Sequence, residues 1–378
     1  MAADSIPLPS QLARLPFTAG EREAFSSVDF PPLVSVQMAT VLERLAGRMA
    51  EDLEATDWYR GLSRQLFPQP EENLVLSEEL ADPLGARLHQ ATERMVHQYK
   101  NRVLVLATSR CFAHCRYCFR KSLITESLQG AGGQSSCGSC LGWPASQEID
   151  EMAAYLAAHP EVQEVLLSGG DPLTAPFHQV EELVARFREA RPGLLVRLCT
   201  RAISFHPAVF TPRLVEGLRR LRPLWVIPHI NHPAEISPRY APESREALLR
   251  LVDSGIPVQS QTVLLRGVND EVATLSRLFH QLTLLGVRPG YLFQCDLVPG
   301  TSHLRVPVEE GVALYHQLRR ELSGLSCPVY AVDLPGGGGK LNLLELDPSL
   351  NPTQVRRLED CYQFVKADGS VWRYPRRE

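Results

Sequence analysis

Three cysteines, Cys111, Cys115 and Cys118, lie within one eight-residue stretch and have the spacing C-x3-C-x2-C. Three thiolates at this spacing can bind three irons of a [4Fe–4S] cluster and leave the fourth iron open to a small molecule that reacts there. A structural zinc site needs four protein ligands, and His114, inside the loop between two of the cysteines, is poorly placed to be the fourth. The spacing therefore favours an iron–sulfur cluster, with a zinc site or buried thiols without a metal as the alternatives.

A second candidate is Lys340, which follows four glycines in the run Pro335-Gly-Gly-Gly-Gly-Lys340. Glycine adopts positive φ without strain and lets the backbone approach a bulky group, so a flexible loop of this composition can present the amine to a cofactor. A lysine in an apolar pocket is suited to form a Schiff base, for example with pyridoxal 5′-phosphate (PLP). The run is not a Walker A loop, because Leu341 stands where that motif has Ser or Thr. A surface turn with a solvated lysine is the alternative.

A glycine pair lies within the short polar segment formed by Ser168, Gly169, Gly170 and Asp171. This segment follows an apolar run, so the bare backbone of the glycines can lie against a cofactor. The same residues can instead form a tight turn in which Asp171 caps the segment that begins at Pro172.

Two carboxylates and one arginine are further candidates. Asp296 and Asp333 follow late apolar runs, where they can clamp a cation or form structural salt bridges with Arg201 or Arg266. Arg120, two residues after Cys118, can meet an anion near the cysteines, or it can be an ordinary solvated arginine.

These residues are positioned by a regular alternation of apolar, β-branched runs and amphipathic stretches. The alternation predicts βαβ units and a parallel sheet. Six units without the glycine fingerprint of a doubly wound sheet predict an α/β fold with a partial (β/α)6-type TIM barrel. The expected strands are 103–108, 162–168, 196–200, 225–230, 258–265 and 291–298, and the expected helices are 147–158, 179–190, 212–220, 242–254 and 271–285.

The polar motifs follow the expected strands one after another. In a parallel barrel, the carboxyl ends of the strands meet at one mouth, where active sites are built. Six or seven polar strand ends at one mouth are hard to explain by stability alone, so the pattern predicts an enzyme.

The composition bears on the binding partners and the cellular compartment of this enzyme. The 378 residues are 44% hydrophobic and 22% charged, with a formal charge of −4, which gives no reason to expect a nucleic acid or an anionic membrane as partner. No apolar run is long enough for a membrane span and the N-terminus has no signal-peptide core. Nine cysteines, an odd number, fit a reducing compartment, so we expect a cytoplasmic protein.

Six motifs in the same order resemble the lysine 2,3-aminomutase family, which comprises radical S-adenosylmethionine (radical SAM) enzymes that also use PLP. The motifs are CFAHCRYCFRK, LLSGGDPL, HINHPAEIS, QTVLLRGVND, QCDLVPGTSHLR and DLPGGGGK. The resemblance implies an isomerase with a [4Fe–4S] cluster, SAM and PLP, which moves an amino group from C2 to C3 of an amino acid. It also implies a reductant protein such as flavodoxin or ferredoxin, and a homo-oligomer.

The resemblance assigns roles to residues of this chain by motif. Cys111, Cys115 and Cys118 are then the cluster ligands, and Lys340 is the lysine that binds PLP. The substrate contacts implied are Arg120 to the carboxylate, and Asp296 and Asp333 to the side-chain ammonium. The cofactor contacts implied are Ser168, Gly169, Gly170, Asp171, His229 and Gln261 toward SAM, and Arg102 toward PLP.

We expect three regions: a helical N-terminal region over 1–95, the radical SAM partial barrel over 96–311, and a C-terminal segment over 312–378 with Lys340 and a tail. We expect a terminal hairpin around Ala367-Asp-Gly-Ser. Two features depart from the family pattern. An insertion contains Cys137 and Cys140, which can be half of a metal site or two spare thiols, and the tail lacks the cysteines that some members use for zinc between subunits.

Two acids that oppose one ammonium favour a cationic amino acid, and free L-lysine is the expected substrate. Arginine or another amino acid, and the lysine modification of elongation factor P, are the alternatives within this chemistry. A non-catalytic zinc-binding scaffold, with Cys137 or Cys140 as an added ligand, is the alternative from another class; it has no need of Lys340 and its glycines.

Overall fold

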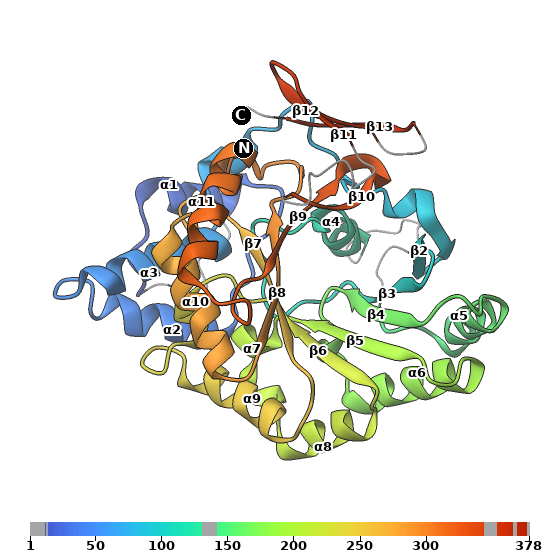
Figure 1. The fold of residues 1–378 in the computed structure, drawn as a ribbon. Helices are drawn as coiled ribbons and strands as arrows, with labels where there is room; N and C mark the ends of the chain where they lie inside the picture. The colour runs from blue at the N-terminus through green and yellow to red at the C-terminus, as the bar shows by residue number, and fades with distance from the viewer. Residues whose placement is uncertain (1–11, 13, 131–141, 344–353, 366–368, 376–378) are drawn as a thin grey trace.

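The computed structural model describes residues 12, 14–130, 142–343, 354–365 and 369–375. Its centre is a curved wall of seven parallel strands, β3 to β9 (Figure 1). Two hydrogen-bonded sheets make up this wall, and the isolated bridges Val226–Val258 and His229–Gln261 join them in parallel register. The partial barrel predicted from the sequence is confirmed.

The first sheet has the strand order β1-β2-β3-β4-β5-β6, and the second has the order β10-β9-β8-β7. Strands β1, β2 and β10 are antiparallel to their neighbours and extend the wall at its two edges. The strands are β1 Gln90–Thr92, β2 Met95–Tyr99, β3 Arg102–Thr108, β4 Glu164–Gly169, β5 Leu195–Thr200, β6 Leu224–Pro228, β7 Gln259–Leu264, β8 Arg288–Gln294, β9 Val329–Leu334 and β10 Gly339–Asn342. All six expected strands are present, and β9 adds a seventh that ends beside Asp333.

Amphipathic helices cover the outside of the wall, as expected from the alternation. Thr211 caps one of them, since its side chain accepts a hydrogen bond from the Leu214 N–H, and Pro212 occupies the first helical position. The helices that follow the cysteine loop are α4 Lys121–Gly130, α5 Ser146–Ala158, α6 Phe177–Ala190, α7 Ala202–Phe205, α8 Pro212–Arg220, α9 Pro242–Asp253, α10 Val272–Leu284 and α11 Val308–Glu321. Short 3-10 turns follow several strands: η3 Pro172–Thr174, η4 Pro207–Val209, η5 Pro233–Ile236, η6 Ser302–Leu304 and η7 Pro335–Gly337.

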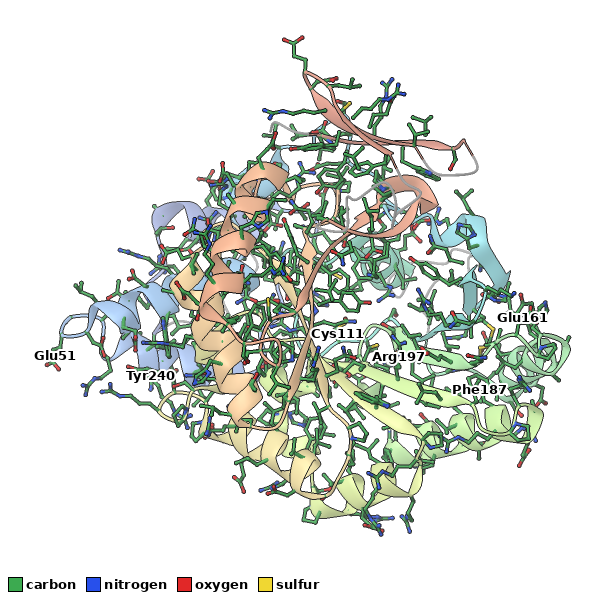
Figure 2. All side chains as sticks on the ribbon, in the orientation of Figure 1. Glu51, Cys111, Glu161, Phe187, Arg197 and Tyr240 are labelled. Carbon is green, nitrogen blue, oxygen red and sulfur yellow. The ribbon has the colours of Figure 1, made fainter. Side chains whose placement is uncertain are left out.

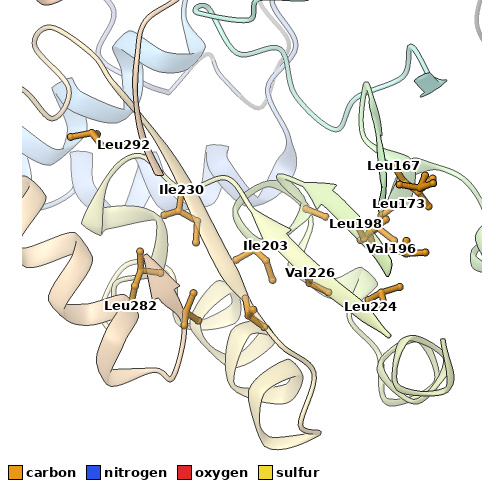
Figure 3. Packing of buried hydrophobic residues seen from close by; sticks show 14 of the residues in the cluster. Leu167, Leu173, Val196, Leu198, Ile203, Leu224, Val226, Ile230, Leu282 and Leu292 are labelled. Atoms are coloured by element: carbon orange, nitrogen blue, oxygen red, sulfur yellow. The ribbon is translucent and has the colours of Figure 1, made fainter. Parts of the chain in front are cut away.

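The main hydrophobic core lies between the strands and these helices (Figure 3). Val196 and Leu198 of β5, Val226 of β6, Leu282 of α10 and Leu292 of β8 are fully buried. Burying one such side chain stabilises the fold by about 1.5–3 kcal/mol. The core therefore holds the strand ends in fixed positions relative to one another.

The N-terminal region is helical, with α1 Ala19–Ser27, α2 Val36–Ala46, α3 Leu53–Leu66, η1 Pro70–Asn73 and η2 Ala86–His89. It has a hydrophobic cluster of its own, which includes Leu42, Phe67, Ala113 and Phe205. Because Ala113 belongs to the cysteine loop, this region packs directly on that loop. Among the described helices, none is long and apolar enough to cross a membrane.

The C-terminal part adds a separate three-stranded sheet, with β11 Gln354–Arg357, β12 Cys361–Val365 and β13 Val371–Pro375. Strands β12 and β13 are antiparallel neighbours, as the expected terminal hairpin requires. The turn residues 366–368, as well as Cys137 and Cys140 of the insertion, lie outside the described residues.

Candidate active site

A cavity of about 360 Å³ occupies the inside of the partial barrel. The cavity lies between β2 and β3 on one side and β9 and β10 on the other. Helix α4 covers part of the gap between these two pairs of strands (Figure 1). The volume of the cavity is in the usual range for a small-molecule site. Five of the predicted site residues line the cavity: Arg102, Arg120, Gln261, Asp333 and Lys340.

The cysteine loop connects β3 to α4 at the edge of this cavity. Figure 2 shows Cys111 near the middle of the view, with Glu51 and Glu161 at opposite sides of the molecule. Burial raises the pKa of the Cys111 thiol well above its ordinary value, and the nearby Cys118 and Cys115 raise it further. The three thiols are free and close enough to affect one another. Phe119 and Arg120, which follow Cys118 directly, form the cavity wall on this side.

A single metal ion and an iron–sulfur cluster place different demands on the three cysteines. Among the described residues, no three His, Cys, Asp or Glu side chains converge closely enough to hold one metal ion. A [4Fe–4S] cluster makes a different demand, because each thiolate binds a separate iron.

Arg201 provides a positive charge beside the cysteine loop, a role that sequence reasoning missed. Its guanidinium donates hydrogen bonds to the Cys115 sulfur, at 3.2 Å, and to the Tyr117 hydroxyl. On its other side it pairs with the buried Glu235 at 2.7 Å. The position of Arg201 just after β5 was the only sequence signal for it.

The glycine pair after β4 packs against the chain's own backbone. Gly169 has a φ of +108°, and a Cβ at Gly169 or Gly170 would collide with the backbone of Thr108 or Arg110. The Asp171 N–H donates to the Arg110 carbonyl at 2.7 Å, which ties the end of β4 to the start of the cysteine loop. Only glycine permits this close approach. Contact of Ser168, Gly169 and Gly170 with SAM stays a prediction.

Asp171 is occupied by protein groups. Its buried carboxylate accepts hydrogen bonds from the Thr200 hydroxyl at 2.8 Å, from the Arg201 N–H at 2.8 Å and from the Leu173 N–H at 3.0 Å. It therefore caps the turn η3 and joins the ends of β4 and β5. This is the capping alternative of the sequence analysis, and contact of Asp171 with SAM stays a prediction.

Arg120 follows the cysteine loop directly, whereas His229, after β6, and Gln261, within β7, are neighbours on adjacent strands. The Arg120 guanidinium donates to the Ser168 hydroxyl at 3.0 Å and lies over the Phe119 ring. His229 pairs with Gln261 through a parallel bridge, and its ring lies 5.7 Å from that of Tyr117. Burial and the nearby Arg201 lower the pKa of His229 to about 3, so its imidazole is neutral at physiological pH.

Lys340 lies on β10 opposite Asp333 on β9, and its side chain points into the cavity. The Lys340 Nζ atom is 2.9 Å from the Asp333 carboxylate and 3.8 Å from the centroid of the Phe293 ring. The Lys340 side chain is 25% exposed, so the alternative of a solvated lysine in a surface turn is wrong. The amine is presented next to an aromatic wall, an environment suited to a Schiff-base lysine.

The glycine run before Lys340 is closely packed. Gly336, Gly337 and Gly339 have positive φ angles, as expected for glycine. A Cβ at Gly338 would come within 2.8 Å of the Trp372 ring. The expectation of a flexible loop is thus replaced by a packed turn that leads into strand β10.

The two acids predicted to bind a cation lie close to each other. Burial raises the pKa of Asp296 to about 8, and the negative charge of Asp333 raises it too, whereas Lys340 and Arg120 act in the opposite direction. The two arginines proposed as structural partners have other ion pairs, since Arg201 pairs with Glu235 and Arg266 pairs with Glu310, whereas Asp333 pairs with Lys340. Asp296, Asp333, Lys340 and Arg120 therefore form one electrostatic group.

Tyr99 connects Arg102 to the Lys340 strand, and sequence reasoning missed it. Its hydroxyl accepts a hydrogen bond from the Lys340 backbone N–H at 2.8 Å. The Arg102 guanidinium lies 3.8 Å from the centroid of the Tyr99 ring. Arg102 is thus on the same side of the cavity as Lys340, where a phosphate-bearing cofactor would need a cation.

Residues 105–279 match the family model described as the radical SAM superfamily. A putative L-lysine 2,3-aminomutase from Treponema pallidum is 48% identical over 84% of this chain and 84% of its own length. An L-lysine 2,3-aminomutase from Fusobacterium nucleatum is 36% identical over 74% of this chain and 62% of its own length. A glutamate 2,3-aminomutase from Clostridioides difficile is 32% identical over 71% of this chain and 59% of its own length. Among solved structures, Streptococcus suis SuiB bound to S-adenosylmethionine aligns with 61% of this chain and 49% of its own, at 12% identity and a TM-score of 0.43.

Proposed function

The chain belongs to the lysine 2,3-aminomutase family of radical SAM enzymes, and we propose that it is an isomerase that converts free L-lysine to L-β-lysine. The observation that carries the choice of reaction is the group of four ionisable residues inside the barrel. This group places an amine, two carboxyl groups and a guanidinium near one another, and Arg120, Asp333 and Lys340 among them line the cavity. A diamino acid has the complementary charges: an α-carboxylate, an α-amine and a side-chain ammonium.

Members of the radical SAM family use a [4Fe–4S] cluster and SAM. We assign Cys111, Cys115 and Cys118 to the cluster, and His229, directly after β6, and its partner Gln261 within β7 to SAM. When bound, these two groups supply a carbon radical that removes a hydrogen atom from the substrate. A one-electron donor protein such as a flavodoxin or a ferredoxin is the proposed reductant.

PLP is the proposed third cofactor, and the residues around Lys340 are suited to it. Lys340 would hold the cofactor covalently, and the Arg102 guanidinium would pair with its phosphate. Phe293 and Tyr291 line the cavity beside the Lys340 amine and keep water away from it. Bound PLP would activate the amino group that moves.

Two kinds of group are suited to hold the substrate. The Arg120 guanidinium is suited to bind the α-carboxylate in a bidentate manner. Asp296 and Asp333 are suited to bind the side-chain ammonium. A glutamate side chain would bring a third carboxylate to these two acids, so its binding is disfavoured by charge repulsion.

An anaerobic assay tests the proposal. The cluster-loaded protein is incubated with PLP, SAM and a chemical reductant, and with one free amino acid at a time from a panel that includes lysine, arginine and glutamate. Mass spectrometry and chromatography identify the product. We expect β-lysine from lysine, and no comparable product from glutamate.

A matched variant controls for background chemistry. The exposed Lys100 is replaced by alanine in parallel with Lys340, and only the Lys340→Ala protein is expected to lose the product. If the protein converts arginine in preference to lysine, the proposed substrate is wrong. A protein that binds zinc and stays colourless after iron and sulfide are supplied would overturn the reaction class.

A further inference from the structure

We propose that strand β13, at the end of the described chain, is a positioning element of the active site. Trp372 fixes the conformation of the glycine run that presents Lys340. Tyr374 fixes the backbone that follows β8 and carries Asp296. The inference rests on the proposed function for the roles of Lys340 and Asp296, and it assigns a task to a segment without any catalytic motif of its own.

The two residues lie on the inner face of the small C-terminal sheet. Residues two apart on a strand share a face, so Trp372 and Tyr374 point the same way and Arg373 points the opposite way. Tyr374 is buried and Trp372 is half-buried against the main core, whereas Arg373 is exposed. Trp372 is also paired across the sheet with the buried Phe364.

The Trp372 ring covers the glycine run. A Cβ built at Gly336 would be in van der Waals contact with this ring, at 3.6 Å, and one at Gly338 would overlap with it. Glycines provide no side chains to fix their own backbone, and this run has several positive φ angles that only packing can select. The flat ring supplies that packing directly before Lys340. Figure 1 shows β13 above the turn that joins β9 to β10.

The Tyr374 hydroxyl reaches the other half of the charged group. It donates a hydrogen bond to the Cys295 carbonyl at 2.9 Å. Cys295 directly precedes Asp296, so this buried bond fixes the backbone from which the carboxylate projects. Strand β13 therefore touches the ends of β8 and of β9–β10, and it sets the distance between Asp296 and Lys340.

Three variants separate the contact of Trp372 with the glycine run from the hydrogen bond of Tyr374 to Cys295. Trp372→Ala removes the ring, Trp372→Phe keeps a smaller ring, and Tyr374→Phe removes only the hydroxyl. Arg373→Ala, on the outer face of the same strand, is the matched control. PLP attachment is measured by borohydride reduction and mass of the Lys340 peptide, and lysine use is measured as KM and kcat.

We expect Trp372→Ala to lower the apparent PLP affinity by about tenfold, and Trp372→Phe to restore most of it. We expect Tyr374→Phe to keep PLP attachment but to raise the KM for lysine several-fold with little change in kcat. Iron content and thermal unfolding are measured for each protein. If Trp372→Ala fails to fold, Trp372→Leu, which keeps apolar bulk without a flat ring, takes its place.

The inference is overturned if the Trp372 variants bind PLP as tightly as the Arg373→Ala protein, or if Tyr374→Phe leaves the KM unchanged. A loss of iron in parallel with PLP would also overturn it, because it would indicate general unfolding. PLP attachment does not depend on catalysis. Its loss in Trp372→Ala would therefore stand even if the wild-type protein isomerised no amino acid.

Discussion

The amine of Lys340 and the carboxylate of Asp333 are direct partners across two antiparallel strands, with 2.9 Å between Nζ and Oδ2. This pair has a consequence for the order of events at the site. The same carboxylate is proposed to receive the side-chain ammonium of the substrate, so two amines compete for it. Attachment of PLP to Lys340 would free Asp333 for the substrate.

Replacing Lys340 by methionine should strengthen the binding of a small diamine to the cofactor-free protein. The variant removes the internal competitor for Asp333 while it keeps the apolar length of the side chain. We expect 1,5-diaminopentane to bind about tenfold more tightly than to the wild-type protein, as measured by calorimetry. Lys100→Met, at an exposed position, should leave the affinity unchanged. Equal affinities in all three proteins would show that Lys340 does not occupy the cation site.

Lys340→Ala should abolish covalent attachment of PLP, because it removes the amine that binds the cofactor. It should leave the cluster intact, because Lys340 lies on β10 and not on the cysteine loop. Borohydride reduction followed by mass spectrometry measures the attachment, and iron analysis measures the cluster. Stoichiometric labelling of the variant would mean that another lysine holds the cofactor.

Asp333→Asn should weaken the use of lysine far more than it weakens reductive cleavage of SAM. The amide keeps the shape of the side chain but removes the charge that binds the substrate ammonium. The two activities are measured in parallel, as β-lysine and as 5′-deoxyadenosine. An equal loss of both would point to a structural role for Asp333 in the β9–β10 pair.

The stability of the cofactor-free protein should depend on pH through Asp296. Its pKa is about 8 in the folded protein, mainly because of burial and then because of Asp333, and about 3.9 in an unfolded chain. The folded state therefore favours the protonated acid, and this stabilisation is lost as the pH rises from about 4 to about 8. Asp296→Asn imitates the protonated form and should be more stable than wild type by roughly 1–3 kcal/mol at pH 8 and by less at pH 5. Denaturant unfolding measures the difference.

The exposed Asp253 gives a control for this experiment. Asp253→Asn should shift stability by the same small amount at both pH values. If the difference in unfolding free energy between wild type and Asp296→Asn does not grow with pH, the raised pKa of Asp296 is contradicted.

Arg201→Met should reduce cluster incorporation and stability together. It removes the donor to Cys115 and leaves Glu235 buried without its ion-pair partner, a change that destabilises proteins by about 3–5 kcal/mol. Iron per chain and denaturant unfolding measure the two effects. Arg186→Met, which breaks an exposed pair with Asp150, is the control and should change little. If the Arg201→Met protein binds as much iron as the wild type, Arg201 does not contribute to cluster binding.

Several elements were predictable because their signals are local. The expected helix over 212–220 coincides with α8, since Thr211, Pro212 and the apolar face are all encoded within one short segment. The strands were predictable for the same reason, and with them the convergence of Arg120, Gln261 and Asp333 on one cavity.

Other site residues had no local signal. Tyr99 and Trp372 meet the Lys340 segment from opposite ends of the chain, and neither belongs to a motif. Asp171 looked equally suited to a cofactor and to a cap until Thr200 and Arg201 were brought beside it. Such partners are chosen by packing between segments far apart in sequence.

The sequence by itself determined the order of βα units, the three thiols and the presence of an amine and two acids at strand ends. These follow from residue type and short-range periodicity, which each segment carries alone. Only the tertiary structure decided that Asp333 pairs with Lys340, that Arg201 supports Cys115, and that β13 holds both late strand ends. Charge pairing and close packing depend on distances in space, and the folded barrel sets those distances.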